Sequence, residues 1–348
     1  MTMVVTGAGG FLGGALVRAL LAEGHQVRAL VRRSQQARDL AALGATPIVG
    51  DVTDLASCMA LAAEGAVIVH AAARVALQGR WRDFHQATVL GTQRLLEAAL
   101  PRRPRRFVYV SSAAVYRPIR DRRGLRADRS PTGPPRYNFY GRAKLAAEGL
   151  VRRRCADVDC PWTILRLGFL YGPGSRALLE HFLPMARDGK LRIVGSGSNR
   201  LATVYIDDAV AAVLRAAALP VAAGRVYDVA GDEPVTQEDF VQATAAALGL
   251  PPIRRRLGKR AAFVAAWLVE RWAAWTGRRA RISRALVDLM STDQTIDASL
   301  ARAELGWQPR VSFAEGMRRT REWYRRLTRE GTVSEGESLP APASRVPA

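Results

Sequence analysis

The chain has 348 residues, of which 49% are hydrophobic and 24% are charged, and its formal net charge is +21 at pH 7. This length and balance are typical of a globular protein with a large core, and they exclude a disordered or fibrous chain. Lysine occurs only at Lys144, Lys190 and Lys259, so nearly all basic residues are arginines. They are spread evenly rather than clustered with aromatic residues, so we expect no nucleic-acid-binding module.

Cysteines and histidines indicate the compartment and argue against a metal site. Cys58, Cys155 and Cys160 are odd in number and lack metal-ligand spacing, which favours a reducing, cytoplasmic location. The four histidines show no HExxH or similar grouping, so we expect no metal. The chain starts with the strand-like MTMVVTG rather than a basic leader and an apolar core, so we do not expect export.

Strand-like and helix-like stretches alternate along the first half of the chain. The strand-like ones are rich in Val and Ile: MVVT, QVRALV, TPIVG, AVIVH, RFVYVSS and PWTILRL. Such strands, separated by Ala- and Leu-rich helices, are typical of βαβ units in a doubly wound parallel sheet with helices on both faces. We therefore predict an α/β, Rossmann-type domain over residues 1–170.

Beyond residue 170 the alternation loosens. A helix near residues 178–187, a short strand at LRIVG, a turn and helix at TVYIDDAV and a strand at RVYDVA precede a mostly helical region. We predict a smaller, mainly helical substrate-binding lobe from residues 171–202 and 231–330, with residues 203–230 returning to the larger domain. The polar, Pro- and Ser-rich residues 331–348 are expected to be a disordered tail.

The segment TGAGGFLG, residues 6–13, follows the first strand and opens a helix. Its glycines allow a tight turn, a close approach of the backbone to a pyrophosphate and the packing of helix on strand. The start of the helix then supplies free N–H groups to the phosphates. We therefore predict a dinucleotide site that includes Gly7, Gly10, Phe11, Leu12 and Gly13.

Residues after the second and third strands bear on which dinucleotide is bound. Val31 stands where an NAD-binding protein carries Asp or Glu, and the next residues, Arg32 and Arg33, can grip a 2′-phosphate. NADP(H) is therefore favoured over NAD(H), unless the two arginines are merely solvated. Asp51 could accept a hydrogen bond from the adenine amino group, or its neighbourhood could instead cap a helix.

The segment YNFYGRAK, residues 137–144, places Tyr140 and Lys144 four residues apart, on one face of a helix. A nearby ammonium and a positive nicotinamide would lower the tyrosine pKa from about 10, so that the phenol could act as a general acid or base. A hydroxyl from FVYVSSAAVY, at the end of the fifth strand, could hold the substrate oxygen. The spacing alone also suits two neighbours on an ordinary helix.

Taken in order, TGAGGFLG, GDVTD, VIVHAAA, VYVSSAAVY, YGRAK, LRLGFLYGPGSR and VYIDDAV resemble the extended short-chain dehydrogenase/reductase superfamily, over about residues 1–325. Within it the chain is most similar to the 3β-hydroxysteroid dehydrogenase/isomerase group and the 2-alkyl-3-oxoalkanoate reductases. The resemblance implies three catalytic residues: Ser112, Tyr140 and Lys144. Tyr140 and Lys144 would also contact the cofactor.

The resemblance assigns further contacts and an assembly state. Additional cofactor contacts are expected from Val52, Ala71 and Ala72. Substrate contacts are expected from Ser111, Tyr137 and Tyr171. A homodimer through two exposed helices of the larger domain is the family-based expectation.

Three departures from the family pattern separate reaction types. Thr88 stands where a helix Asn is usual, which puts a proton relay or structural contact in doubt. Ala113 and Ala114 replace the Asp-Glu pair of sugar-nucleotide dehydratases, so dehydration is not expected. Leu201 occupies the position of the arginine that clamps a diphosphate in many epimerases, and Arg200, one residue early, should point the other way.

The leading hypothesis is an NAD(P)-dependent oxidoreductase that interconverts a secondary alcohol and a ketone. Its substrate would be bulky and mainly apolar, either steroid-like or a long-chain 3-oxoacyl compound, and Tyr, Lys and Ser would assist the hydride transfer. The alternatives are an NAD-dependent sugar-nucleotide epimerase and a non-catalytic dinucleotide-binding subunit.

The sequence allows two interpretations for each of two further segments. AAFVAAWLVERWAAW, residues 261–275, is flanked by RRRLGKR and GRRAR and interrupted by Glu270 and Arg271, so it cannot span a bilayer. It could lie on an anionic membrane surface, or pack in the smaller lobe by its Ala and Trp face. The arginine-rich insert at residues 117–136 could be a solvated loop or a rim that attracts an anionic substrate.

Overall fold

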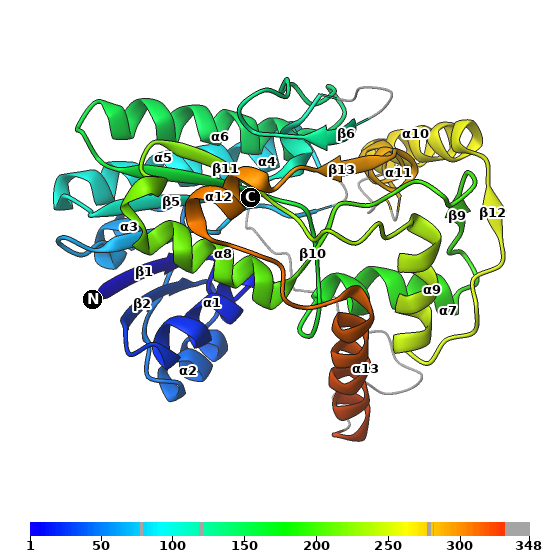
Figure 1. Cartoon of the computed structure of the whole chain (residues 1–348), viewed down its shortest axis with the longest axis horizontal. Coiled ribbons are helices and arrows are strands. Elements are labelled where there is room, and N and C mark those ends of the chain that lie inside the picture. The colour runs from blue at the N-terminus through cyan, green and yellow to red at the C-terminus, as the bar shows by residue number, and fades with distance from the viewer. Residues whose placement is uncertain (77–78, 118–121, 277–279, 281, 331–348) are drawn as a thin grey trace.

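The computed structural model describes residues 1–76, 79–117, 122–276, 280 and 282–330 (Figure 1). The predicted tail at residues 331–348 lies outside the described residues. So do residues 118–121 of the arginine-rich insert and most of the GRRAR flank.

A seven-stranded, all-parallel sheet forms the centre of the larger part of the molecule, and the predicted α/β fold class is confirmed. In sheet order the strands are β3 (Thr46–Val49), β2 (Gln26–Val31), β1 (Thr2–Thr6), β4 (Val67–His70), β5 (Arg106–Ser112), β7 (Trp162–Leu167) and β11 (Arg225–Val229). The strand order reverses between β1 and β4. In such sheets the crevice at the carboxyl ends of these two strands is where ligands bind.

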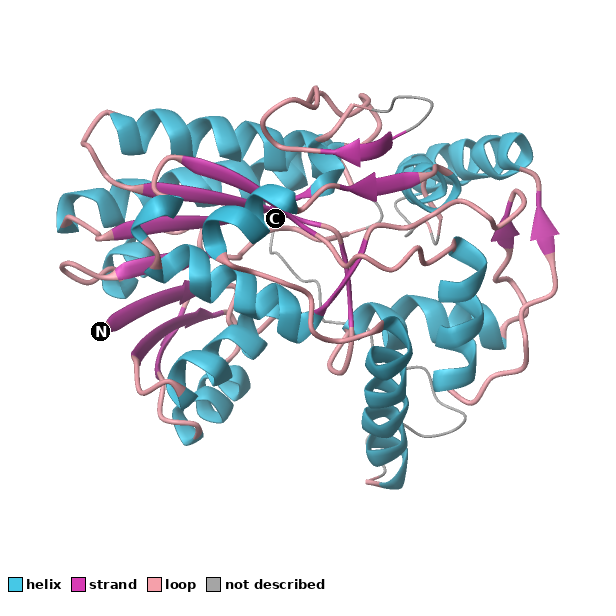
Figure 2. Ribbon diagram, in the orientation of Figure 1, coloured by secondary structure: helices cyan, strands magenta, loops and turns pink. Residues whose placement is uncertain are grey.

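Helices cover both faces of the sheet because its strands are apolar on both sides (Figure 2). In β5, for example, Val108 and Val110 face one core while Phe107 and Tyr109 face the other. The first core is covered by α1 (Phe11–Ala22), α2 (Ser34–Ala42), α8 (Ile206–Ala218) and α12 (Ser299–Leu305). The second is covered by α3 (Leu55–Leu61), α5 (Gly91–Ala99) and α6 (Phe139–Ala156).

Three two-stranded parallel pairs join distant parts of the chain outside the large sheet. They are β8 (Phe169–Tyr171) with β10 (Thr203–Tyr205), β9 (Ile193–Val194) with β12 (Arg256–Leu257), and β6 (Arg122–Leu125) with β13 (Gln294–Ile296). The sequence did not predict β6, β8, β12 or β13. Strands of two to four residues carry no periodic signal, and they form because of their partners.

The remaining helices lie mainly beyond the carboxyl edge of the sheet (Figure 1). They are α4 (Trp81–Phe84), α7 (Leu183–Arg187), α9 (Gln237–Ala247), α10 (Lys259–Thr276), α11 (Arg284–Ser291) and α13 (Phe313–Arg329). None of the described helices has the length and apolarity needed to cross a bilayer.

Three arginines in the described part of the insert are paired with carboxylates. Arg123 lies 2.8 Å from Asp293, and Arg126 and Arg129 lie 3.7 and 3.3 Å from Asp297. Such surface pairs contribute little to stability, but they neutralise local charge. These three arginines therefore do not form the cationic rim that was one interpretation of this insert.

Candidate active site

The turn between β1 and α1 places backbone where a side chain would not fit. Gly7 has a φ of +71°, and a Cβ there would lie 2.8 Å from the backbone nitrogen of Ala72. A Cβ at Gly13 would overlap the carbonyl oxygen of Gly7, which accepts a hydrogen bond from the Gly10 N–H at 2.9 Å. The turn therefore lies directly against the end of β4 and brings Ala71 and Ala72 to the predicted cofactor site.

The first turn of α1 fits a phosphate group. Gly10 caps the helix without a side-chain hydrogen bond, and no acidic residue stands in the first turn. The N–H groups at this helix start, which include those of Phe11 and Leu12, therefore keep their positive dipole available for an anion. These residues fit the pyrophosphate of a dinucleotide.

Behind the turn, a buried histidine joins the ends of β1 and β4 to α5. Ala72 N–H donates to Thr6 Oγ1 at 3.2 Å, and Thr6 Oγ1 lies 2.7 Å from His70 Nδ1. On the other side, His70 Nε2 lies 2.8 Å from Thr92 Oγ1, which donates to the Thr88 carbonyl. Because Thr92 donates to Thr88, it must accept from His70, so the imidazole carries a proton on Nε2. Burial lowers the pKa of His70 to about 3, and Lys144 adds to the shift.

Thr88 makes a structural contact at the position where the family carries Asn. Its buried hydroxyl accepts a hydrogen bond from the Arg74 N–H at 3.2 Å, and it lies in a π-helical segment, His85–Leu90, that precedes α5. The loop after β4 is thus held from both ends, at Ala72 by Thr6 and at Arg74 by Thr88.

Arg32 and Arg33 lie at the carboxyl end of β2, and both are exposed. Arg33 is the N-cap residue that directly precedes α2. Within the described ranges, neither guanidinium has an acidic partner, so their charge is not neutralised by the fold.

Of the two interpretations of the neighbourhood of Asp51, the structure shows the helix cap, while the contact of Asp51 with adenine stays a prediction. Asp54 caps α3 by accepting hydrogen bonds from the N–H groups of Ala56 and Ser57. Asp51 instead accepts from the Thr53 N–H and hydroxyl at 2.9 and 2.8 Å and stays half-buried at the sheet edge. Val52 is buried in the core, so only its backbone can reach a cofactor.

The start of α6 is docked on the turn that follows Ser112. Asn138 caps the helix by accepting from the Gly141 N–H at 2.9 Å, and its side-chain N–H₂ donates to the Ala114 carbonyl at 3.3 Å. A Cβ at Gly141 would overlap that same carbonyl oxygen. Asn138 and Gly141 thus fix where Tyr140 stands relative to Ser112, and sequence reasoning missed both.

The structure brings the side chains of Ser112 and Tyr140 together. Burial raises the pKa of Tyr140 above its ordinary value, and a hydrogen bond with Ser112 opposes that rise. The Ser112 hydroxyl also accepts a hydrogen bond from the Ala114 N–H at 3.2 Å, which fixes its orientation. The two hydroxyls form a pair that can hold one substrate oxygen.

Lys144 lies one helical turn further along α6 and is almost completely buried. Its Nζ donates to the Val110 carbonyl at 2.6 Å and lies 4.8 Å from the centre of the Tyr109 ring. Burial lowers the pKa of Lys144 to about 7, and the carboxylate of Glu148 acts in the opposite direction.

Glu148, a further turn along the same face of α6, is a positioning residue that sequence reasoning missed. It accepts two hydrogen bonds from Arg166 at 3.0 and 2.7 Å and one from Ser111 at 2.6 Å. The repeat of Tyr140, Lys144 and Glu148 at four-residue spacing was the available signal. The Ser111 hydroxyl thus donates to a buried carboxylate. We therefore do not include Ser111 among the proposed substrate contacts.

The same network continues to β11. Arg166 donates to the hydroxyl of Tyr116 at 3.3 Å, and that hydroxyl donates to Asp228 at 2.7 Å. Burial raises the pKa of Asp228 to about 7, while the hydrogen bond from Tyr116 and the positive charge of Arg166 act to lower it. Helix α6 is thus tied to β5, β7 and β11 by these buried polar groups, all of them partnered.

Tyr137 and Tyr171, the other expected substrate contacts, lie in different surroundings. The Tyr137 ring packs edge-on against Phe263 of α10 at 5.5 Å, with the guanidinium of Arg284 5.1 Å from its centre. Tyr171 is buried against Tyr205 and other aromatic rings. Tyr137 thus lies between the start of α6 and α10, whereas Tyr171 faces α9 and α13.

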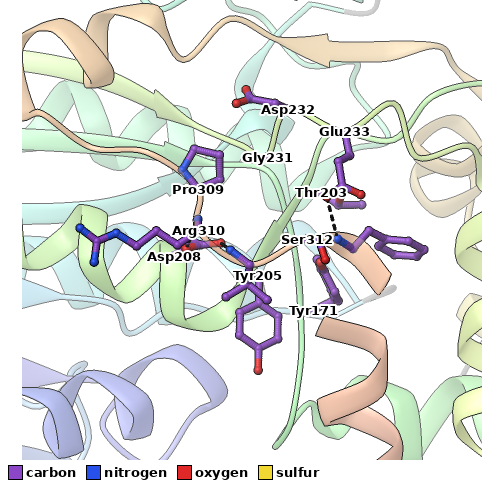
Figure 3. Close-up of a pocket in the computed structure, with 12 residues that line it drawn as sticks. Tyr171, Thr203, Tyr205, Asp208, Gly231, Asp232, Glu233, Pro309, Arg310 and Ser312 are labelled. Atoms are coloured by element: carbon purple, nitrogen blue, oxygen red, sulfur yellow. Dashed lines mark hydrogen bonds between the residues drawn. The ribbon is translucent and has the colours of Figure 1, made fainter. Parts of the chain in front are cut away.

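Tyr171 lines a separate cavity of about 290 Å³, which none of the three predicted catalytic residues lines (Figure 3). In this cavity Asp208 accepts hydrogen bonds from the N–H groups of Arg310 and Val311 at 2.8 and 3.2 Å. Glu233 accepts one from the Phe313 N–H at 3.0 Å. These bonds hold the C-terminal segment in place, and the substrate contact expected of Tyr171 is not supported.

The position that would carry a diphosphate-clamping arginine is in the core. Leu201 is buried in the same cluster as β1 and α1, while Arg200 is exposed. Their side chains point to opposite sides, as expected for neighbours on an extended segment. Ala113 and Ala114 form a tight 3₁₀ turn without acidic groups.

Comparison with known proteins gives matches over nearly the whole chain. The model of the NAD dependent epimerase/dehydratase family matches residues 3–230. A 2-alkyl-3-oxoalkanoate reductase from Stenotrophomonas maltophilia is 33% identical, over 92% of this chain and 98% of its own. A 4-hydroxy-2-methyl-3-oxo-4-farnesyl-3,4-dihydroquinoline-1-oxide ketoreductase from Stigmatella aurantiaca is 32% identical, over 91% of this chain and 95% of its own.

Solved structures with the same fold include proteins in complex with a sugar nucleotide and NAD. MoeE5 in complex with UDP-glucose and NAD has a TM-score of 0.71 and 26% identity, over 94% of this chain and 99% of its own. The UDP-glucuronic acid 4-epimerase from Bacillus cereus, solved with UDP-glucuronic acid and NAD, has a TM-score of 0.73 and 22% identity, over 94% of this chain and 100% of its own. The second likeness concerns the fold alone.

Proposed function

The chain belongs to the NAD dependent epimerase/dehydratase family, and from that premise we propose that it is an NADP(H)-dependent ketoreductase acting on a bulky, mainly apolar substrate. The resemblance to the extended short-chain dehydrogenase/reductases is confirmed, and with it the expectation of an NAD-dependent enzyme. The observation that carries the proposal is the pairing of the Ser112 and Tyr140 hydroxyls, with Lys144 buried behind them.

Each of the three residues has a separate task in the proposed reduction. Ser112 orients the carbonyl oxygen of the substrate, and Tyr140 gives that oxygen its phenolic proton. Lys144, in its ammonium form, stabilises the phenolate that remains. A reduced nicotinamide, when bound, supplies the hydride that reaches the carbonyl carbon. Hydride and proton together convert the ketone to a secondary alcohol, and the reverse reaction uses Tyr140 as the base.

The preference for NADP(H) rests on the charge at the end of β2. Arg32 and Arg33 are exposed, and Val31, where a carboxylate would repel a 2′-phosphate, is buried and apolar. Arginine can bind a phosphate through two parallel hydrogen bonds. Asp51 remains available at the next strand end for the adenine amino group.

The substrate class follows from what surrounds the catalytic pair. Tyr137 and Phe263 offer an aromatic wall, and no acidic pair follows Ser112 to support water elimination. Two relatives above 30% identity bear names of enzymes that reduce ketones, one of them a 2-alkyl-3-oxoalkanoate. We therefore propose a long-chain 3-oxoacyl compound or a steroid-like ketone as the substrate.

A sugar-nucleotide epimerase is the second candidate, favoured by the likeness to MoeE5 with its UDP-glucose and NAD. The buried Leu201 argues against it, because an arginine able to clamp a diphosphate is missing at this position.

A substrate and cofactor panel tests the proposal. Purified protein would be examined by native mass spectrometry for retained nucleotide, then assayed for NADPH and NADH oxidation with 2-alkyl-3-oxo esters, keto steroids and UDP-sugars. We expect faster NADPH than NADH oxidation with an apolar ketone. Retained NAD with turnover of UDP-sugars, and no reduction of ketones, would overturn the proposed function.

The homodimer expected from the family remains a prediction, which analytical ultracentrifugation would test.

A further inference from the structure

Helix α10 carries a row of exposed apolar side chains, which we call its outer face. Val264 and Leu268 are each 54% exposed and Trp275 is 86% exposed, with Trp267 also in solvent. Their spacing of three, four and seven residues puts them on one side of the helix. Every tryptophan that is exposed in the described part of the chain lies on α10.

The opposite side of α10 is fixed to the protein. Ala262 and Ala266 are fully buried against Val287 of α11 and Val194 of β9, and Phe263 packs on Tyr137. The sequence offered a helix packed by its Ala and Trp face as one interpretation. The structure shows the alanines buried on the inner side of the helix, while Trp267, Trp272 and Trp275 are exposed.

The charged side chains beside the outer face are all positive. Arg260 and Arg271 are exposed at helical spacing from the apolar side chains. The only acidic residue of α10, Glu270, turns inward and binds Arg284 at 2.6 Å. Arg254 and Arg255 are exposed just before the helix. The outer face is therefore apolar and cationic, without a carboxylate.

We propose that the outer face of α10 binds an anionic membrane surface. Indole rings favour the boundary between headgroups and acyl chains, and arginines beside them bind anionic headgroups while their stems stay in the apolar layer. A second copy of the chain is a poorer partner, because two such faces would bring like charges together. The helix lies in the plane of the surface and does not span it.

This orientation has a consequence for the active site. The inner side of α10 contacts Tyr137 through Phe263, and Tyr137 stands three residues before Tyr140. If the protein binds a membrane through the outer face, Phe263 and Tyr137 lie directly behind α10, on the side away from the membrane. These two rings form the aromatic wall proposed above for the substrate. An apolar ketone dissolved in the bilayer would reach the enzyme there. This consequence rests on the proposed function, whereas membrane binding itself does not.

Vesicle binding tests the proposal. The full chain would be sedimented with sucrose-loaded vesicles of phosphatidylcholine containing 30% phosphatidylglycerol, and with vesicles of phosphatidylcholine alone. We expect binding to the anionic vesicles, weaker binding to the neutral ones, and a loss of binding in high salt. Quenching of tryptophan fluorescence by brominated lipids should show that the indoles enter the interface.

Two pairs of variants separate the apolar and cationic contributions. Leu268→Ser with Trp275→Ser should weaken binding at least about tenfold, since burying one large apolar side chain is worth about that factor. Arg260→Glu with Arg271→Glu should weaken it by roughly fivefold or more per residue on anionic vesicles only. The matched controls are Val158→Ser, whose side chain is also 54% exposed, and Arg105→Glu, also exposed.

The proposal is overturned if wild type and both pairs of variants sediment alike. It is also overturned if no vesicle binds but Leu268→Ser with Trp275→Ser abolishes a concentration-dependent dimer, because the face would then belong to a second copy. Thermal unfolding and NADPH binding should be unchanged in all variants. If the protein does not bind vesicles but reduces a water-soluble ketone, membrane binding is refuted and the proposed function stands. If it binds vesicles but reduces no ketone, the proposed function is refuted and membrane binding stands.

Discussion

Ser111 and Ser112 have different tasks because neighbouring residues of a strand point to opposite faces of the sheet. Ser111 donates to Glu148 in the interior, whereas Ser112 meets Tyr140. The two positions therefore allow a comparison in which, on the proposed function, only the Ser112 hydroxyl would touch the substrate.

We expect Ser112→Ala to lower kcat by roughly a hundredfold or more, as for other single donors to a reacting oxygen. Ser111→Ala should leave kcat within a few fold but lower the free energy of unfolding by about 1.5–3 kcal/mol, because a buried carboxylate loses a donor. Steady-state kinetics and urea unfolding of both variants would check this. Equal losses of kcat in the two variants would contradict the assignment.

The choice of dinucleotide is also decided by single residues. Replacing Arg32 and Arg33 by Ala should weaken NADPH binding by at least about tenfold and leave NADH binding nearly unchanged, since charge-assisted hydrogen bonds contribute about 1.5–3 kcal/mol. Arg38→Ala, further along α2, is the control. Calorimetric titration with both nucleotides measures the ratio, and an unchanged ratio would show that the two arginines are only solvated.

Helix α6 owes its position to the Asn138 cap and to the close approach of Gly141 to the carbonyl oxygen of Ala114. Asn138 binds the backbone at Gly141 and Ala114, and the missing Cβ of Gly141 lets the helix approach the turn after Ser112. Because Tyr140 lies between these two residues, a small shift of the helix start moves the phenol away from Ser112.

Gly141→Ala should lower the free energy of unfolding by about 1–3 kcal/mol through overpacking, and should lower kcat as well. Gly149→Ala is a control on the same helix, since a Cβ there would meet only the end of the Arg153 side chain at 3.3 Å. It should stabilise the protein by about 0.5–1 kcal/mol, because alanine is the better helix former. Thermal unfolding of both variants measures the difference, and similar shifts would contradict this account of the docking.

The ends of β1, β4 and α5 share a buried neutral histidine, which makes their junction sensitive to acid. Because the folded-state pKa of His70, about 3, lies below the ordinary value of 6.5, the unfolded chain binds the proton first as the pH falls. Its contribution is therefore present above pH 6.5 and is lost from there toward pH 3. Asp228, whose pKa burial raises to about 7, acts in the opposite direction over part of this range.

The difference between wild type and His70→Gln isolates the histidine from Asp228. Between pH 6.5 and 5 the unfolding free energy of the wild type should fall relative to the variant by up to about 1.4 kcal/mol per pH unit. Urea unfolding at several pH values measures this, with His25→Gln as the control. Parallel curves for wild type and His70→Gln would mean that His70 titrates normally.

At the scale of the whole molecule, the sequence predicted the elements that have a local pattern. It did not predict the contacts between residues far apart in the chain. Runs of Val and Ile predicted all seven strands of the large sheet, and the glycine turn and the Tyr140–Lys144 spacing predicted most of the site. Asp208, which binds backbone about a hundred residues later, and the pairing of β6 with β13 have no local signal. The contacts of Tyr171 with aromatic residues of α9 and α13 likewise depend on distant partners.

The central claim, that this chain reduces a ketone with Tyr140 as the proton donor, is tested most directly by Tyr140→Phe. Single-turnover oxidation of bound NADPH by an apolar 3-oxo ester would be followed in this variant, in wild type and in Tyr137→Phe. Tyr140→Phe should keep its fold and bind NADPH normally while hydride transfer slows by a factor of about 10² to 10⁴, and Tyr137→Phe should stay within a few fold of wild type. Hydride transfer at the wild-type rate in Tyr140→Phe would contradict the account.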